Sequence, residues 1–170
     1  VYDLFVPSAS AEELQAGLRL AQRRVETVLD VAGGTGRAAR ALTDTASSLS
    51  GTTSTLDSPV VLDISAAMLA RAAAAGLPAI RGDARQPPIK DDAVDAIVIT
   101  DALHHVPEPG RALEACAELV APGGVVVIRE FDPMTRRGRL LVALERLARM
   151  DSVFFEPDEL AGSLRKMGLD

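Results

Sequence analysis

VLDVAGGTG, at residues 28–36, joins a short apolar run containing one acid to a turn with three glycines. An apolar run of this length is typical of a buried strand, and the glycines let the backbone turn sharply with positive φ. A side chain at Gly34 or Gly36 would also hold a ligand away from the backbone. The stretch therefore predicts a strand that delivers its carboxyl end to a nucleotide-like ligand, with these two glycines at the binding site.

Composition narrows the class of protein. The chain has 170 residues, 48% of them hydrophobic, and this fits one globular domain with a layered core. A formal net charge of −6 gives no electrostatic reason to expect nucleic acid or an anionic membrane as partner, so a small-molecule ligand is favoured. No segment is apolar for long enough to span a membrane and no signal region opens the chain, so we expect a cytoplasmic protein.

Apolar Val/Ile runs alternate with helical patterns along most of the chain, which indicates a doubly wound α/β domain with a parallel sheet covered on both faces. A serine- and threonine-rich run at residues 43–58 is interpreted as a loop. Strands are expected at about 25–31, 60–63, 78–81, 94–100 and 125–129, and helices at 11–23, 37–42, 66–75, 109–120, 140–150 and 157–167.

The pattern divides this single domain, residues 1–170, into three parts. A helical segment at 1–24 precedes a cofactor-binding core at 25–132, and a helical segment at 133–170 follows it. Leucines and phenylalanines between residues 140 and 155 predict an apolar lid over a substrate, although core packing or a homodimer contact would explain them equally. The sheet is expected to end early, because no strand follows the last helix, and strand five would then be an exposed edge.

One acid stands at or just beyond the end of each of the first four predicted strands: Asp30, Asp63, Asp83 and Asp101. Ligands of open α/β sheets bind outside the carboxyl ends of the strands, so these acids predict one shared crevice. Asp63 would accept the two hydroxyls of a ribose, or else cap the next helix. Asp83, beside Ala84, would accept from the exocyclic amine of adenine, or else cap a turn. Asp30 would orient backbone amides or a ligand ammonium through water, or only fix the loop.

Two other functions fit parts of the pattern. Residues 34–39, GTGRAA, match the G-x-G-x-x-A fingerprint of dinucleotide-binding proteins such as NAD-dependent oxidoreductases. That fingerprint needs an acid about 20 residues further on and usually a second half-domain. Asp63 comes later than this and no second half is evident, so the oxidoreductase is the weaker alternative. A cofactor-binding or interaction module without catalysis is the other alternative.

Five segments in order resemble the motifs of class I S-adenosylmethionine-dependent methyltransferases, which have a Rossmann-like fold. The resemblance covers residues 25–132. Within the class, AGGTG together with REFDP at 129–133 is most similar to the C-methyltransferases of ubiquinone and menaquinone biosynthesis. The resemblance implies methyl transfer from S-adenosylmethionine to a small, apolar or aromatic acceptor, with a quinone precursor among the candidates. The five segments are 30–36, 62–69, 82–84, 92–99 and 119–128.

The resemblance also implies roles for single residues. Asp63 would bind the ribose, Asp83 with Ala84 would frame the adenine, and Ile64 and Met68 would pack around its ring. Thr100 or Asp101 would face the cofactor near the methyl group, and Tyr2-Asp3 would close over it. The residues lining the methionine portion would be Ala32, Gly34 and Gly36.

Methyl transfer from a sulfonium needs alignment and exclusion of water more than acid–base machinery. A base helps when the acceptor is a hydroxyl, phenol or quinol, and an imidazole suits that task. The candidates are His104 or His105, one of which would otherwise only bond a turn, with Glu130 and Asp132 as secondary candidates. Adjacent histidines rarely point at one ion, and with a single cysteine in the chain no metal site is expected.

Three features depart from the family's pattern. Quinone methylases carry an Arg-Asn pair where this chain has His104-His105, although a His-His pair is common in the wider family. The loop after the first core helix is longer than usual. The family's last two strands are expected to be missing from this sequence.

Overall fold

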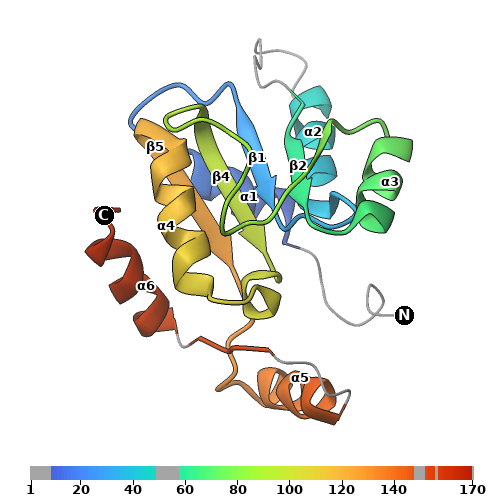
Figure 1. Cartoon of the computed structure of the whole chain (residues 1–170), viewed down its shortest axis with the longest axis vertical. Coiled ribbons are helices and arrows are strands. Elements are labelled where there is room, and N and C mark those ends of the chain that lie inside the picture. Colours follow the sequence, from blue (N-terminus) through green and yellow to red (C-terminus); the bar gives the residue numbers. More distant parts are fainter. Residues whose placement is uncertain (1–8, 49–57, 148–151, 156, 170) are drawn as a thin grey trace.

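The computed structural model describes residues 9–48, 58–147, 152–155 and 157–169, and Figure 1 shows a sheet with helices packed around it. All neighbouring strands are parallel, and their order is β3-β2-β1-β4-β5. The predicted doubly wound α/β sheet with a Rossmann-like strand order is confirmed. The strands are β1 (Val28–Val31), β2 (Val60–Asp63), β3 (Ala79–Arg81), β4 (Val94–Thr100) and β5 (Val120–Arg129).

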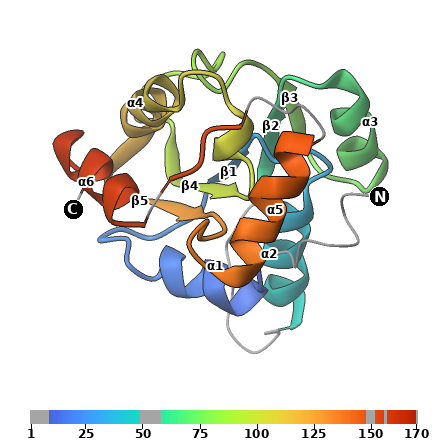
Figure 2. The same cartoon turned by 90° about the horizontal axis from the view of Figure 1, so that it is seen from below.

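Helices cover the two faces of the sheet as separate layers (Figure 2). On one face, Leu14 and Leu42 pack with Val28 and Val98 of the central strands. On the other, helices near the C-terminus pack on Leu29, Ile97 and Ile99. The first layer holds α1 (Ala11–Leu18), α2 (Arg37–Ser48) and α3 (Ala66–Ala74), and the second holds α4 (Pro109–Leu119) and α6 (Pro157–Lys166).

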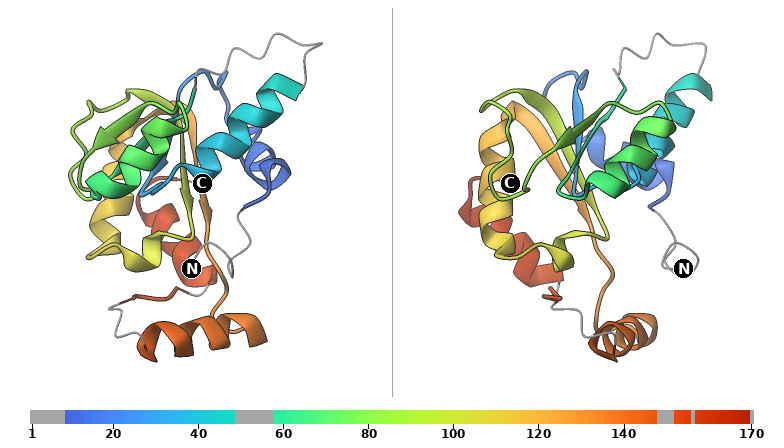
Figure 3. Two further views of the ribbon diagram at one scale, coloured as in Figure 1. Left: turned by 90° about the vertical axis from the view of Figure 1, so that its right-hand side faces the viewer. Right: turned by 45° about the vertical axis from the view of Figure 1, so that its right-hand side comes forward.

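Beyond the carboxyl ends of the strands lies α5 (Arg136–Leu147), which stands apart from both layers (Figure 3). Two of its leucines, Leu140 and Leu147, are 61% and 82% exposed, and no residue of α5 belongs to the core clusters of the described residues. The helix expected at 140–150 thus begins earlier, at Arg136, and lies at the end of the sheet where ligands of this fold bind, while the segment's role as a lid stays a prediction. No described helix combines the length and the apolar character needed to cross a membrane.

Local sequence explains where several helices begin and end. Ser10 and Glu13 form a capping box, in which the Glu13 amide donates to Ser10 Oγ at 3.2 Å and the Ser10 amide donates to Glu13 Oε2 at 2.9 Å. Ser65 caps α3 by accepting from the Met68 amide. Gly76, with φ of 82°, stands just past the end of that helix.

The loop predicted at residues 43–58 is wrong in its first part, because α2 continues to Ser48. Thr43 directs its hydroxyl to the carbonyl oxygen of Ala39, one turn back, at 2.9 Å. A bond of this kind satisfies the hydroxyl inside the helix, so the polar run does not end the helix where its apolar pattern stops. Residues 49–57 lie outside the described part of the chain, as do Tyr2 and Asp3.

Strand β5 begins earlier than predicted. It pairs with β4 from Val120 onward, and Pro122, Gly123 and Gly124 are absorbed by an irregularity in the register between the two strands. In the described sheet β5 is an edge strand, as expected. An apolar hollow of about 400 Å³ runs beside it, between α1 and α6.

Candidate functional site

A cavity of about 560 Å³ opens at the carboxyl ends of β1 to β4. The glycine turn after β1, the ends of β2 and β3, and the segment between β4 and α4 form its walls. Three of the four strand-end acids reach this cavity, so the predicted shared crevice exists. The predicted residues that line it are Ala32, Gly34, Asp63, Ile64, Met68, Asp83, Ala84, Thr100, Asp101 and His105. Asp30, Gly36 and His104 do not line it and are buried beneath its walls.

The two singled-out glycines are needed for different reasons. Gly34, with φ of 58°, faces the cavity, and a Cβ there would meet only Asp63 Oδ2 at 4.0 Å. Gly36, with φ of 74°, faces the interior, where a Cβ would lie 2.3 Å from Leu77 Cδ1. Gly34 thus leaves room for a ligand, whereas Gly36 lets the turn pack on the body of the domain. A methionine-binding role for Gly36 stays a prediction.

Asp30 is fully buried under the glycine turn. Its Oδ2 accepts from the Ala39 amide at 3.2 Å, and its Oδ1 meets no donor among the described residues. Burial raises the pKa of Asp30 to about 7, because the charged form loses its hydration. Its carboxylate touches the turn directly, since a Cβ on Gly33 would lie 2.5 Å from Asp30 Cγ. This placement favours the loop-fixing alternative over direct contact with a ligand.

Asp63 joins the end of β2 to the glycine turn. Its Oδ2 accepts from the Gly34 amide at 2.8 Å, and its Oδ1 accepts from the Ser65 amide at 2.7 Å. Each carboxylate oxygen has a second lone pair, so both can still accept from a ligand hydroxyl. Ile64 and Met68 stand beside it, 64% and 42% exposed, and provide an apolar surface in the same wall.

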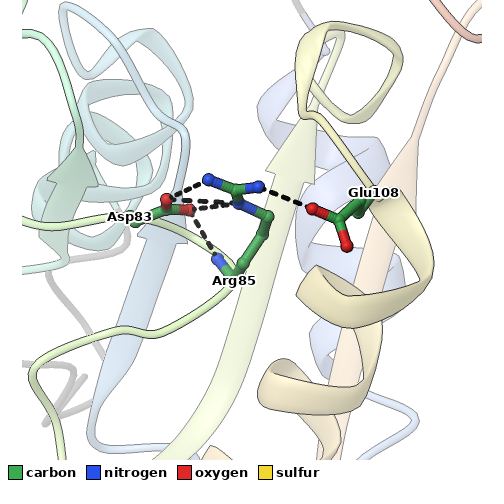
Figure 4. A network of polar contacts seen from close by, with 3 residues as sticks. All are labelled: Asp83, Arg85 and Glu108. Atoms are coloured by element: carbon green, nitrogen blue, oxygen red, sulfur yellow. Dashed lines mark hydrogen bonds and ion pairs between the residues drawn. The ribbon is translucent and has the colours of Figure 1, made fainter.

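Asp83 lies just beyond β3 and is held by an arginine two residues away (Figure 4). Arg85 donates its Nη2 to Asp83 Oδ2 at 2.7 Å and its Nη1 to Glu108 Oε1 at 2.9 Å. Hydrogen bonds from Arg85 lower the pKa of Asp83 to about 2. Asp83 is therefore a firmly ionised acceptor at the cavity wall, as its predicted role requires.

Asp101 ends β4 with a left-handed backbone, φ of 47°. Its side chain is 2% exposed and forms an ion pair with Arg129 of β5 through Oδ2. Its Oδ1 meets no donor among the described residues, and burial raises the pKa of its carboxyl. Thr100 lines the cavity directly before it. This part of the cavity wall is thus polar, and the Asp101 carboxylate in it is itself buried.

The adjacent histidines have different surroundings within the short 3₁₀ helix η2 (Leu103–His105). His104 is buried, and its Nδ1 lies 2.5 Å from Glu130 Oε2. His105 is exposed, lines the cavity, and has its Nδ1 3.2 Å from Ser152 Oγ. Of the two predicted bases, His105 lines the cavity and His104 does not; the role of either as a base stays a prediction.

Glu130 binds η2 and the residue before it through both of its carboxylate oxygens. Its Oε1 accepts from the amides of Ala102 at 2.9 Å and Leu103 at 2.6 Å, while its other oxygen pairs with His104. The side chain is 9% exposed. The secondary candidate Glu130 thus supports the segment that carries His105, whereas Asp132 bonds to the Met134 amide outside the cavity wall.

Sequence reasoning missed several polar and apolar residues of the wall. The glycine turn offered no reason to single out Arg37, and Arg85 was detectable only as a cation two residues after Asp83. Val106 and Pro107 were hidden in a segment with no pattern of its own. In the described part of the chain, no group of three or more His, Cys, Asp or Glu side chains is placed to hold a metal ion.

Comparison with known proteins defines the class. Residues 29–128 match the family described as methyltransferase domain. The S-adenosylmethionine-dependent methyltransferase of Thermotoga maritima shares the fold, with a TM-score of 0.74 and 24% identity over 92% of this chain and 68% of that one. Another from Mesorhizobium loti gives a TM-score of 0.67 and 22% identity, over 94% and 81% of the two chains. The fold of this chain is therefore shared with these S-adenosylmethionine-dependent methyltransferases.

The chain belongs to the methyltransferase domain family, so the predicted resemblance is confirmed. Among curated proteins, the demethylmenaquinone methyltransferase of Mycolicibacterium paratuberculosis is 36% identical over 116 residues, which cover 62% of this chain and 50% of that protein. The protein of the same name from Mycobacterium bovis is 37% identical over 114 residues. The chain spans about half the length of the curated relatives it matches.

Proposed function

We propose that this chain transfers the methyl group of S-adenosylmethionine to a small apolar or aromatic acceptor. One observation carries the proposal: Asp63, Asp83 and Asp101 line a single cavity, and the open backbone at Gly34 forms part of the same wall. A cytoplasmic location, and the homodimer that the sequence leaves open, stay predictions.

The residues of the cavity fit the cofactor. Asp63 retains lone pairs for the two ribose hydroxyls, and Asp83 is an ionised acceptor for the adenine amine. Ile64 and Met68 offer an apolar surface to the ring, and Gly34 lets the methionine portion approach the backbone. When bound, S-adenosylmethionine supplies a methyl group activated by a positively charged sulfur.

The other end of the cavity receives the acceptor. His105 stands at its wall and would take the proton of an acceptor hydroxyl, phenol or quinol. Asp101 and Thr100 form the base of this end, where alignment and exclusion of water do most of the catalytic work. This end of the cavity, here called the methyl end, thus combines His105, which can reach a ligand, with the buried groups Asp101, His104 and Glu130.

Two observations favour an apolar or aromatic acceptor. The rings of Phe131 and Phe154 lie 5.0 and 6.1 Å from that of His104, so an aromatic cluster adjoins the 3₁₀ helix that carries His105, outside the cavity wall itself. The curated relatives are named for a quinone-type acceptor, which makes quinone precursors the first class to test. The His-His pair departs from the quinone methylase pattern, so phenols belong in the same screen.

Calorimetric titration with S-adenosylmethionine, S-adenosylhomocysteine and NAD tests the cofactor. We expect the S-adenosyl ligands to bind and NAD not to bind. Asp63→Ala removes two charge-assisted hydrogen bonds to the ribose and should weaken binding about 100-fold. Asp91→Ala, at an exposed aspartate outside the cavity, is the matched control and should leave affinity unchanged. A folded wild type that binds NAD and no S-adenosyl ligand would overturn the proposal.

A further inference from the structure

Arg85 lines the cavity at the end predicted for adenine. Figure 4 shows it between Asp83 and Glu108, bonded to both. Its side chain folds back onto Asp83, with Nε at 3.1 Å from Oδ1 and Nη2 at 2.7 Å from Oδ2. Its own backbone amide donates to the same Oδ1 at 2.9 Å. Three donors of one residue therefore fix the orientation of the Asp83 carboxylate.

This arrangement leaves Asp83 able to accept one more donor. A carboxylate offers about four acceptor positions. The Arg85 amide and Nε occupy the two on Oδ1, and Nη2 occupies one on Oδ2. The single hydrogen of Nε is shared with Oδ2 at 3.2 Å, as the longer of its two contacts, so one position on Oδ2 stays available. The remaining capacity on Oδ2 suits a single N–H. Because the carboxylate cannot turn without breaking these bonds, a ligand carbonyl at the same place would meet a fixed negative charge.

The guanidinium also ties the two walls of the cavity together. Its Nη1 bonds Glu108, which follows the lining residues Val106 and Pro107 and has a left-handed backbone with φ of 50°. Asp83 and Arg85 belong to the opposite wall, after β3. The bridge Asp83–Arg85–Glu108 therefore sets how far the walls stand apart where a purine ring would enter.

We propose that Arg85 is a specificity-determining residue of the adenine subsite, which fixes Asp83 to accept an exocyclic amine and disfavours a purine with a carbonyl in its place. The inference rests on the proposed function, since it assumes that the cavity takes an adenosyl cofactor. Removing Arg85 should weaken binding of the ligand that carries the amine and lower the ratio of affinities for the two purines. If Arg85 instead merely competed with adenine for Asp83, its removal would tighten binding.

The test compares S-adenosylhomocysteine with its deaminated analogue S-inosylhomocysteine by calorimetry. For Arg85→Ala we expect S-adenosylhomocysteine to bind about tenfold more weakly, and the ratio of the two affinities to fall. Arg85→Lys keeps the charge but loses the fork that holds both oxygens, so it should recover only part of the ratio. Arg19→Ala, at an exposed arginine of α1's end, is the control and should change neither affinity.

A double-mutant cycle tests the bridge to Glu108. Glu108→Ala should lower the ratio in the same direction but less, and the double variant should resemble Arg85→Ala alone, because the two residues act through one network. If Arg85→Ala weakened binding of both ligands equally, Arg85 would have only a structural role and the inference would be overturned. Tighter binding of S-adenosylhomocysteine by this variant would overturn it as well. A wild type that binds neither ligand would instead overturn the proposed cofactor, so the two failures are distinguishable.

Discussion

The two ends of the cavity are built in different ways. At the adenosine end, Asp63 and Asp83 accept from amides two residues ahead, so short loops hold each acid where a ligand can reach it. At the methyl end, Asp101 and His104 are buried and pair with Arg129 at the end of β5 and with Glu130 just beyond it. The first end is held mainly within short loops, with one longer-range bond from the Gly34 amide to Asp63, whereas the second depends on the pairing of β4 with β5.

This difference predicts what substitutions at each end will do. Acids of the adenosine end are partly open to water, so their loss should change ligand affinity more than folding. Groups of the methyl end are desolvated and satisfy one another, so the loss of one partner should lower the free energy of unfolding. Four sets of variants, in order of expected effect on stability, test whether the two ends differ in this way.

Glu130→Ala should be the most damaging. It leaves the buried amides of Ala102 and Leu103 and the His104 ring without their acceptor, and should lower the free energy of unfolding by about 3 kcal/mol. Urea unfolding measures this directly. Glu130→Gln keeps one carbonyl oxygen and should lose less. A loss under about 0.5 kcal/mol for the alanine variant would mean that the methyl end does not depend on this carboxylate.

Gly36→Ala and Gly34→Ala form a matched pair within one turn. Both place alanine at positive φ, but only the first drives a Cβ into Leu77. We expect Gly36→Ala to lose about 2 kcal/mol of stability and Gly34→Ala about 1 kcal/mol. Gly34→Ala should nevertheless weaken S-adenosylhomocysteine more, because its methyl group faces the cavity. Equal stability losses would show that packing does not distinguish the two glycines.

Asp30 should give the protein a characteristic pH dependence. Burial raises the pKa of Asp30 to about 7, so the folded state favours the protonated form. This contribution to stability is complete below the unfolded pKa, near ~4, and is lost as the pH rises to about 7, by up to ~1.4 kcal/mol per pH unit. Asp30→Asn should flatten that slope in urea unfolding between about pH 4 and 7, where the folded state binds more protons than the unfolded state. An unchanged slope would contradict the assignment.

His105→Ala should have the smallest effect on folding. Its ring is exposed, so we expect stability within about 0.5 kcal/mol of wild type and unchanged affinity for S-adenosylhomocysteine. With a phenol or quinol acceptor, methyl transfer should fall by roughly 10²-fold or more and lose its dependence on a neutral imidazole. His104→Ala, in the buried ring, should instead lower stability. A reversal of the two results would exchange the roles of the histidines.

The locally built end was the more predictable of the two. The acids at the ends of β2 and β3 follow apolar runs directly, so Asp63 and Asp83 could be placed in a shared crevice from the sequence. The choice between His104 and His105 could not be made, because it depends on which side of η2 meets Glu130. Arg129 and Glu130 acquire their partners only through the register of β5, which no local pattern reveals.

The fold was predictable for a similar reason. Alternating apolar strands and helices report on burial, and Val94–Thr100 was bounded correctly because it is apolar almost throughout. The errors fell where polarity or glycine was misleading. The end of α2 is rich in Ser and Thr and was therefore interpreted as a loop, and the glycines at 123 and 124 concealed the start of β5.

The strand order has a kinetic consequence. β1 and β4 pair through Val28 and Ala96, the widest separation in sequence between any neighbouring strands of the sheet. Closing so long a loop costs more entropy than forming the pairs on either side, which join strands nearer in the chain. The two halves of the sheet are therefore expected to form before they dock. Because the cavity lies across that junction, the last folding step and the assembly of the binding site are one event.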